Sequence, residues 1–441
     1  MEIEKRQVLL ATEAEAYIEA LQKFELENIG SPRWFQQHEY LGKLTMQAVL
    51  SASGQEDEFI KEFFLVMGKV PLVIHELIAV ETWKEKIFPE FVKLKFKPST
   101  SVPLYMVLYQ EAILVTLLEI ILYHQEVLES GEDYILDLLG YCHRKLTDLL
   151  SGNYNPEKDV KEKESDISRT LIDDLQRHKK SMGFDIAMKT VSILRYIAEN
   201  LSSLPLSVTH HILSVHDFPL LLSFLLEEPP WVRCSDNSEE KYIDGKWCLV
   251  EEENRFQITK IEGQVWITLY ILLLSEECQK KYELNSYKKN QILKLRSHLS
   301  EILIEQLPSL QSLQQYLESL SIMEPPAVRR DLIIEQISEL REEFLKEGEG
   351  KWDKISRQQA ETFFSPSLEA LKEHSRRLAD TYSVDILENF VPETPKCCVC
   401  GHSANKRCSR CRNEWYCRRE CQVQHWPKHK VACSLVTNSE S

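Results

Sequence analysis

Apolar residues recur three and four positions apart through most of residues 1–390, which is the spacing of one face of an α-helix. One such stripe consists of Ala187, Val191, Leu194, Ala198 and Leu201. Residues 104–128 are apolar nearly all round, so we expect a helix packed on two sides in an interior layer. Glycine supplies only 13 of 441 residues, which disfavours a fold rich in tight turns. The pattern predicts a mostly α fold.

Several expected helices open with a proline and an apolar run, as at Val70-Pro71, Val102-Pro103 and Phe218-Pro219. Proline suits the first helical turn, where its missing N–H has no partner to lose. The recurrence resembles the inner helices of armadillo-type repeats, in which stacked units bury a continuous core. We therefore favour an armadillo-like α-solenoid for the helical body. Because the recurrences are irregular, 32 and 116 residues apart, an irregular helical bundle is the alternative.

Two stretches interrupt the helical pattern. Residues 151–166 combine glycine, asparagine and proline with a run of charges, which predicts a solvated loop. Within residues 229–263 the pattern changes to short alternating or β-branched segments, Lys246–Val250 and Arg255–Thr259, around an acidic turn. These segments predict a small β-hairpin inserted between helices. The insertion is either a partner site or, as we favour, a long crossover.

The first residues and the long apolar stretches of the sequence bear on the cellular compartment and on membrane insertion. Residues 1–6 lack the basic and apolar regions of a secretory signal, so we expect a reducing setting, either the cytoplasm or the nucleus. One long apolar stretch is broken by Gln110, Glu111 and Glu119, and another runs only from 265 to 274. We therefore expect no membrane insertion.

The helical part of the sequence carries no recognisable catalytic motif. His75-Glu76 begins like a zinc-protease motif, but Ala79 stands where a second histidine is needed one turn later. A phosphate-binding glycine loop and a nucleophile elbow are also missing. We expect that this protein is not an enzyme.

Candidate metal ligands are concentrated at the C-terminal end, where eight of the 12 cysteines lie in the last 45 residues. The residues with metal-ligand spacing are Cys397, Cys400, Cys408, Cys411, Cys417, Cys421, His429 and Cys433. Eight soft ligands suit two tetrahedral, structural Zn²⁺ ions with no open position for catalysis. The segment is too short to bury an adequate core, so metal binding must supply most of its folding free energy. Cys398 and His425 have poorer spacing and are left out of the ligand set.

The spacing, together with Tyr416-Cys417 and His425-Trp426, closely resembles the MYND zinc finger over residues 397–433. The resemblance implies two cross-braced ions, held by Cys397, Cys400, Cys417 and Cys421 (zinc 1) and by Cys408, Cys411, His429 and Cys433 (zinc 2). MYND fingers bind short proline-rich peptides. Gln422 and Trp426 lie four residues apart on one helix face and offer an amide and an aromatic platform for such a peptide. Alternatively, Trp426 packs within the finger.

Charge argues against nucleic acid as a partner. The chain carries a net charge of −16, and the segment from Lys396 to Cys433 is formally +7, which leaves −23 for the rest. Seven thiolates and two Zn²⁺ ions reduce the charge of the finger to about +4. The acidic body repels phosphate, so an acidic protein partner is the better expectation for the finger.

The domain order implies a function by resemblance. A helical body over residues 1–390, a linker at 391–396, a finger at 397–433 and a flexible tail at 434–441 resemble the MYND-finger factors that assemble axonemal dynein arms for motile cilia. A methyltransferase substrate-cofactor motif is missing, and the order of cysteine and histidine differs from RING ligases.

This resemblance implies a non-enzymatic adaptor or co-chaperone for cytoplasmic preassembly of dynein arms. The implied partners are a leucine-rich-repeat dynein assembly factor, heat-shock chaperones with an immunophilin co-chaperone, and dynein chains. The implied location is the cytoplasm, concentrated near the centrosome, the centriolar satellites and the ciliary base. The alternative is a nuclear MYND transcriptional co-repressor adaptor, against which the lack of a basic nuclear-localisation run counts.

Overall fold

The computed structural model describes residues 8–54, 57–98, 100–154, 171–235, 238–323, 337–365, 397–400, 404, 406–409 and 415–438. The chain divides into two units, residues 1–367 and residues 368–441, and each is described by itself. The predicted linker at 391–396 and most of the predicted loop at 151–166 lie outside the described residues.

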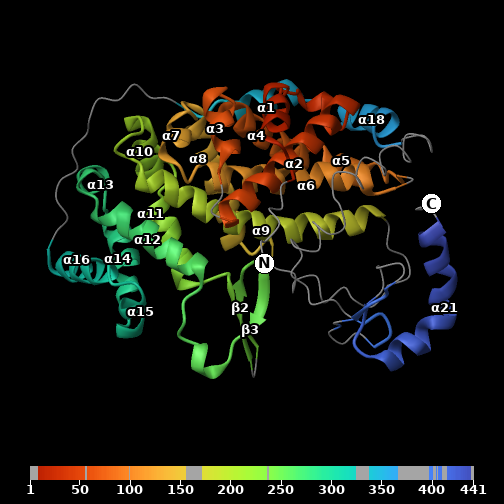
Figure 1. Ribbon diagram of the computed structural model, residues 1–441. Coiled ribbons are helices and arrows are strands. Elements are labelled where there is room, and N and C mark those ends of the chain that lie inside the picture. Colours follow the sequence, from red (N-terminus) through yellow and green to blue (C-terminus); the bar gives the residue numbers. More distant parts are fainter. Residues whose placement is uncertain are drawn as a thin grey trace. The chain divides into compact units, whose positions relative to one another are not determined.

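The first part of the larger unit is helical (Figure 1). Its elements are α1 (Ala11–Glu19), η1 (Leu26–Asn28), α2 (Pro32–Gly54), α3 (Phe59–Val66), α4 (Val70–Lys86), α5 (Phe88–Lys93), α6 (Val102–Ile121), α7 (Gln125–Glu129), α8 (Tyr134–Leu150) and α9 (Leu171–Glu199). Pro71 and Pro103 lie in the first turns of α4 and α6, as their sequence context predicts.

The second part alternates short helices with one small sheet. Its elements are α10 (Leu206–His210), η3 (His211–Val215), α11 (Phe218–Glu227), β1 (Val232–Ser235), β2 (Ser238–Ile243), β3 (Lys246–Leu249), η4 (Glu252–Asn254), α12 (Lys260–Leu274), α13 (Glu276–Lys281), α14 (Ser286–Lys294), η5 (Leu295–Ser297), α15 (Glu301–Gln306), α16 (Leu310–Ile322), α17 (Leu340–Gly348) and α18 (Trp352–Thr362). The prediction of a mostly α fold is confirmed.

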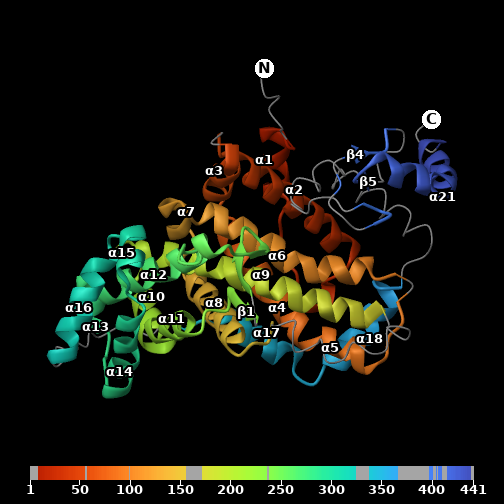
Figure 2. The same ribbon diagram turned by 90° about the horizontal axis from the view of Figure 1, so that it is seen from below.

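Helix α9 is the centre of the larger unit. It packs against α6, α8 and α12, and it runs beside α6 in both views (Figures 1 and 2). The stripe predicted from the sequence is buried on this helix, since Ala187, Val191 and Leu194 are fully covered. Burial of a continuous apolar face on a long helix supplies much of the stability of such a layer.

Helix α6 corrects the expectation about membrane spans. With 20 residues it is long and apolar enough to cross a bilayer by length and composition, and Gln110 and Glu111 do not prevent this. A second stretch, Phe59–Val66 with Val70–Lys93, passes the same criterion only as a pair bent by 94°. However, 67% of the apolar window of α6 is buried in the unit, as is usual for a core helix.

The last helices of this unit return to its beginning. Helix α17 packs against α4, and α18 packs against α5 (Figure 2). The indole of Trp83 donates to Gln359 Oε1 at 2.9 Å, and Gln359 Nε2 donates to the carbonyl of Leu26 at 2.8 Å. Such return contacts are not part of a simple linear stack of repeats. The armadillo-like arrangement therefore stays a prediction.

The interruption at residues 229–263 holds three antiparallel strands in the order β1-β2-β3. Strand β3 matches the predicted segment at Lys246, but its partner is β2, so the strand predicted at Arg255–Thr259 is wrong. The β2–β3 connection is the two-residue turn Asp244-Gly245, in which both residues have positive φ angles of 48° and 82°. An Asp-Gly pair favours such a two-residue turn, which sets the register of the hairpin.

Candidate metal centre

The described residues of the smaller unit include a short hairpin and a helix that follows it. Strand β4 (Lys406–Arg407) pairs with β5 (Trp415–Tyr416), and α21 (Arg419–Asn438) follows. The backbone N–H of Cys398 donates to the carbonyl of Trp415 at 3.1 Å, which ties the first cysteine pair to β5. Residues 434–438, expected in a flexible tail, continue α21.

Four sulfur atoms converge at the start of α21. The Sγ atoms of Cys397, Cys400, Cys417 and Cys421 all lie within 4.8 Å of one another. The Sγ distances are 3.3 Å from Cys400 to Cys417, 3.7 Å from Cys417 to Cys421, and 3.8 Å from Cys421 to Cys400. Four thiolates bound tetrahedrally to Zn²⁺ at 2.3 Å have sulfur atoms about 3.8 Å apart. The donor set and its spacing therefore fit a structural zinc ion.

The proton affinities of two of these thiols diverge because the four groups are so close. Burial raises the pKa of Cys397, but hydrogen bonds from the backbone N–H groups of Cys417, Val399 and Cys400 lower it to about 6. Its neighbour Cys417 has a pKa raised to about 12, first by its side-chain hydrogen bond with Cys400 and then by burial. Zinc binds thiolates, so metal uptake releases the protons that such a cluster otherwise shares.

Half of the second predicted ligand set is also brought together. His429 Nε2 lies 3.3 Å from Cys408 Sγ, and both residues are 3% exposed. Cys411 and the side chain of Cys433 lie outside the described residues. The assignment of all four residues to zinc 2 therefore stays a prediction.

The two residues left out of the ligand set contact each other. Cys398 Sγ lies 3.4 Å from His425 Nδ1, and the Tyr416 hydroxyl lies 3.1 Å from the same nitrogen. The ring of His425 stacks on His429 with 5.7 Å between centroids. Tyr416 is 1% exposed and packs with Ala404 in the small core of the finger. Sequence spacing did not reveal that Tyr416 and His425 contact each other beside the predicted ligand His429. This contact arises because β5 packs against α21.

The two residues predicted to bind peptide lie on α21. Trp426 is 38% exposed, and its ring meets His429 edge to face at 5.9 Å. Gln422, one turn earlier, is half-buried. Trp426 thus contacts a predicted zinc ligand and leaves part of its surface exposed.

The helical body places His75 and Glu76 in the packed interior. The indole N–H of Trp34 donates to Glu76 Oε1 at 2.6 Å, and burial raises the pKa of this carboxyl to about 7. Burial, and then the charge of Lys23, lowers the pKa of His75 to about 4. In the described part of the chain, the group of three or more closely placed metal-ligating residues is the cysteine cluster of the finger.

The profile of the MYND finger family matches residues 397–433. The zinc finger MYND domain-containing protein 10 homolog of Drosophila melanogaster is 31% identical over 95% of this chain and 97% of its own length. Shorter matches are confined to small segments. N-lysine methyltransferase SMYD2 of Rattus norvegicus is 41% identical over 9% of this chain and 10% of its own, and Egl nine homolog 1 of Homo sapiens is 53% identical over 8% and 9%.

No solved structure matches the chain. The family assignment thus rests on the finger and on a relationship that extends through the helical body. The finger, with its cysteine cluster, is a structural zinc-binding module. The chain belongs to the family of the zinc finger MYND domain-containing protein 10 homolog.

Proposed function

We propose that this protein is a non-enzymatic adaptor that assists the cytoplasmic preassembly of axonemal dynein arms for motile cilia. The observation that carries the proposal is the relationship over 95% of the chain to a MYND-finger protein, since it covers body and finger together. A helical unit and a MYND finger on one chain are what the resemblance to dynein-arm assembly factors implies, and this supports the proposal. The division into a helical unit and a zinc-binding unit gives one chain two surfaces for different partners.

The finger is the proposed peptide-binding part. Trp426 is exposed by 38% and is braced by His429, and Gln422 precedes it by one helical turn. An aromatic face beside an amide suits a proline-rich segment, which arrives already extended and loses little entropy. Bound zinc would cross-link the strands to α21 and so fix these two side chains in place.

The helical body is the proposed second binding part. Its partners in this proposal are dynein chains, a leucine-rich-repeat assembly factor, and heat-shock chaperones with their immunophilin co-chaperone. The proposed location is the cytoplasm near the centrosome, the centriolar satellites and the ciliary base. The acidic charge of the body, −23 outside the finger segment, supports proteins rather than nucleic acid as its partners.

Affinity purification of the full-length chain from ciliated cells tests the proposal. We expect dynein chains and chaperones to be recovered. Recovery of chromatin proteins without dynein chains would reject it in favour of the nuclear co-repressor adaptor. Fractionation of the same cells checks the proposed cytoplasmic location.

A substitution on α21 tests the peptide site. We expect Trp426→Ala in the full chain to weaken binding of a proline-rich peptide at least tenfold while bound zinc is unchanged, because the side chain is partly exposed. Val423→Ala is the matched control, since Val423 is 63% exposed on the same helix. Equal peptide affinity in both variants would place the peptide site elsewhere.

A further inference from the structure

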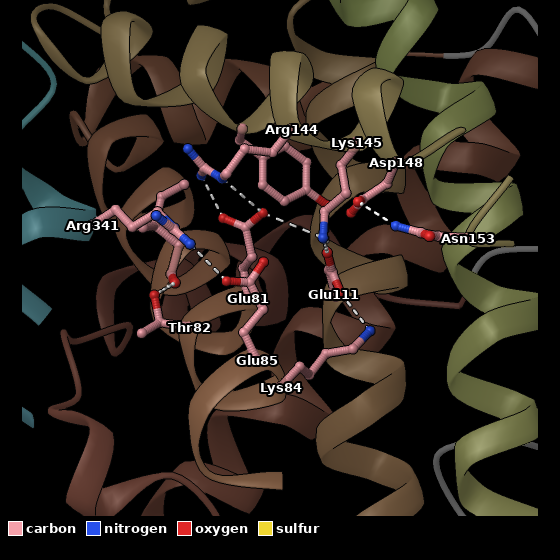
Figure 3. Close-up of polar contacts among 12 residues, drawn as sticks. Glu81, Thr82, Lys84, Glu85, Glu111, Arg144, Lys145, Asp148, Asn153 and Arg341 are labelled. Carbon is pink, nitrogen blue, oxygen red and sulfur yellow. Dashed lines mark hydrogen bonds and ion pairs between the residues drawn. The ribbon is translucent and has the colours of Figure 1, made fainter. Parts of the chain in front are cut away.

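A buried network of charged side chains lies inside the helical body, between α4, α6 and α8 (Figure 3). Arg144 holds Glu81 with two nitrogens, and Lys145 Nζ lies 3.3 Å from Glu81 Oε1 and 2.8 Å from Glu111 Oε1. Lys84 pairs with the other oxygen of Glu111. The network thus contains three cations and two carboxylates.

The positive excess of this network affects the proton affinities within it. Burial raises the pKa of Glu111, but Lys145 and Lys84 hold it well below its usual range. The pKa of Lys84 is lowered, first by burial, and the nearby charge of Lys145 adds to this. The Tyr141 hydroxyl donates to Glu111 Oε1 at 2.7 Å. Each of the two carboxylates thus already has two cationic partners within the network.

A cavity of about 830 Å³ opens beside the network. Phe88, Pro89 and Val92 form an apolar part of its wall, and Lys179 of α9 lines it as well. Lys179 Nζ donates to the carbonyl of Lys84 at 2.7 Å and lies 5.6 Å from the centroid of the Phe88 ring. Among the described residues, no carboxylate lies within ion-pairing distance of Lys179.

Three further carboxylates line the cavity: Asp148, Glu85 and Asp173, which is exposed. Asp148 accepts hydrogen bonds from Asn153 Nδ2 at 2.9 Å and from the Tyr154 hydroxyl at 3.3 Å. Glu85 pairs with Arg341 at 2.7 Å (Figure 3). Lys179 is therefore a partly desolvated cation beside a network that already has an excess of positive charge. A cation in such a place is stabilised by an anion supplied from outside.

We propose that this cavity binds a small-molecule anion, a phosphate or carboxylate group on an aromatic or apolar body. The oxyanion pairs with Lys179, and the body lies on Phe88, Pro89 and Val92. An ammonium group suits either oxyanion as a charge-assisted donor, and the cavity volume falls in the usual range of about 300–1,000 Å³ for ligand sites. Arg177, whose guanidinium pairs with Asp174, and Lys180 also line the cavity and add positive charge near it. The inference goes beyond the proposed adaptor function.

Calorimetric titration of the full chain tests this site with three probes: inorganic pyrophosphate, adenosine monophosphate and indole-3-acetate. We expect the two aromatic anions to bind more tightly than pyrophosphate, because they also cover the apolar wall. The tighter of the two aromatic probes identifies the preferred oxyanion. Lys179→Met should weaken binding at least tenfold, since it removes the charge but keeps the stem. The matched control is Lys189→Met on the same helix, whose ammonium donates to Thr116 Oγ1 at 2.7 Å and lies 3.6 Å from Glu119.

The pH dependence of binding provides a second readout. The groups that influence Lys179 are Lys84, Glu111, Lys145 and Glu85. Burial, and then Lys84, lowers the pKa of Lys179 to about 8 in the free protein. A bound anion favours the charged amine, so affinity should fall above pH 8 and binding at that pH should take up a proton. The proposal is overturned if the three probes fail to bind at millimolar concentration, if Lys179→Met binds as the control does, or if acidic peptides bind in their place.

Discussion

The helical body and the finger obtain their stability from different sources. The body buries large side chains completely, including Trp34, Trp83 and Trp266. Among the described residues of the finger, the small core consists of Cys397, Ala404, Cys408, Tyr416 and Cys421. Each fully buried large apolar side chain contributes about 1.5–3 kcal/mol, so the body can fold by burial, whereas the described residues of the finger include few such side chains. Metal–ligand bonds must therefore replace hydrophobic burial in the finger.

Cysteine illustrates the same difference within one residue type. In the body, Cys142 is fully buried, and burial raises the pKa of its thiol to about 12. In the finger, the thiols of Cys397 and Cys400 lie within 4.8 Å of two further thiols. An isolated buried thiol acts as a small apolar group, whereas converging thiols form a ligand set.

The largest expected effect is the loss of the finger on removal of zinc. Cys417→Ser, or a strong chelator, should unfold residues 397–433, because a structural zinc contributes on the order of 10–16 kcal/mol of apparent folding free energy. The body should keep its thermal unfolding transition. Elemental analysis measures bound zinc, limited proteolysis measures unfolding of the finger, and calorimetry measures the thermal transition of the body. Cys234→Ser, at an exposed site on β1, is the control. If the body lost its thermal unfolding transition as well, the stability of the body would depend on zinc, contrary to this comparison.

The buried ionic network offers the next largest effect. Glu111→Gln should lower the free energy of unfolding of the body by about 3–5 kcal/mol, because it leaves Lys84 and Lys145 buried without their main carboxylate. Glu119→Gln on the same helix should cost less than about 1 kcal/mol, since Glu119 is a partly exposed partner of Lys189. Urea unfolding measures both. Equal costs would mean that apolar burial alone stabilises this layer.

The pH dependence of the body contains a contribution from Glu76. Burial raises the pKa of its carboxyl from 4.5 to about 7 in the folded chain. Between these values the folded chain keeps a proton that the unfolded chain has lost, so the free energy of unfolding falls as pH rises and becomes level above pH 7. Glu76→Gln should remove this fall, which is on the order of 3 kcal/mol from pH 4 to pH 8.

Urea titrations of the unaltered chain and of Glu76→Gln across that pH range give two profiles of unfolding free energy against pH. Their difference is the Glu76 contribution. The contribution of His75, whose folded pKa is lowered to about 4, is present in both profiles and cancels. Trp34 keeps an acceptor, because glutamine retains one side-chain oxygen. Parallel profiles would show that Glu76 is ionised in the folded body.

The smallest effect concerns the sheet. Gly245→Ala should lower the free energy of unfolding by about 1 kcal/mol, because an alanine is strained at a φ of 82°. An added Cβ there meets no atom within 4 Å, so backbone strain alone is tested. In helix α12, Gly263→Ala should instead be neutral or stabilising, since its Cβ would meet Ile258 Cδ1 at an ordinary 3.6 Å. Thermal unfolding of both variants compares them, and equal effects would contradict this interpretation of the turn.

The helices and the finger could be predicted from local pattern. The buried stripe of α9 repeats every three or four residues, and the MYND spacing identified the residues matched by the family profile. The partner of β3 was not predicted, although Asp244-Gly245 indicates a tight turn between β2 and β3. The alternation of apolar and polar residues predicted Arg255–Thr259 as the partner strand instead. A period of two does not specify which strand pairs with which.

The sequence by itself determined the helical class of this protein, its family and its cysteine-rich zinc module, because these depend on spacing along the chain. Only the tertiary structure decided that Gln359 meets Trp83 and that Glu111 lies between Lys84 and Lys145. The same is true of the cavity lined by Lys179. These contacts join residues that are distant in sequence, and their energetics depend on burial, which a local pattern does not specify.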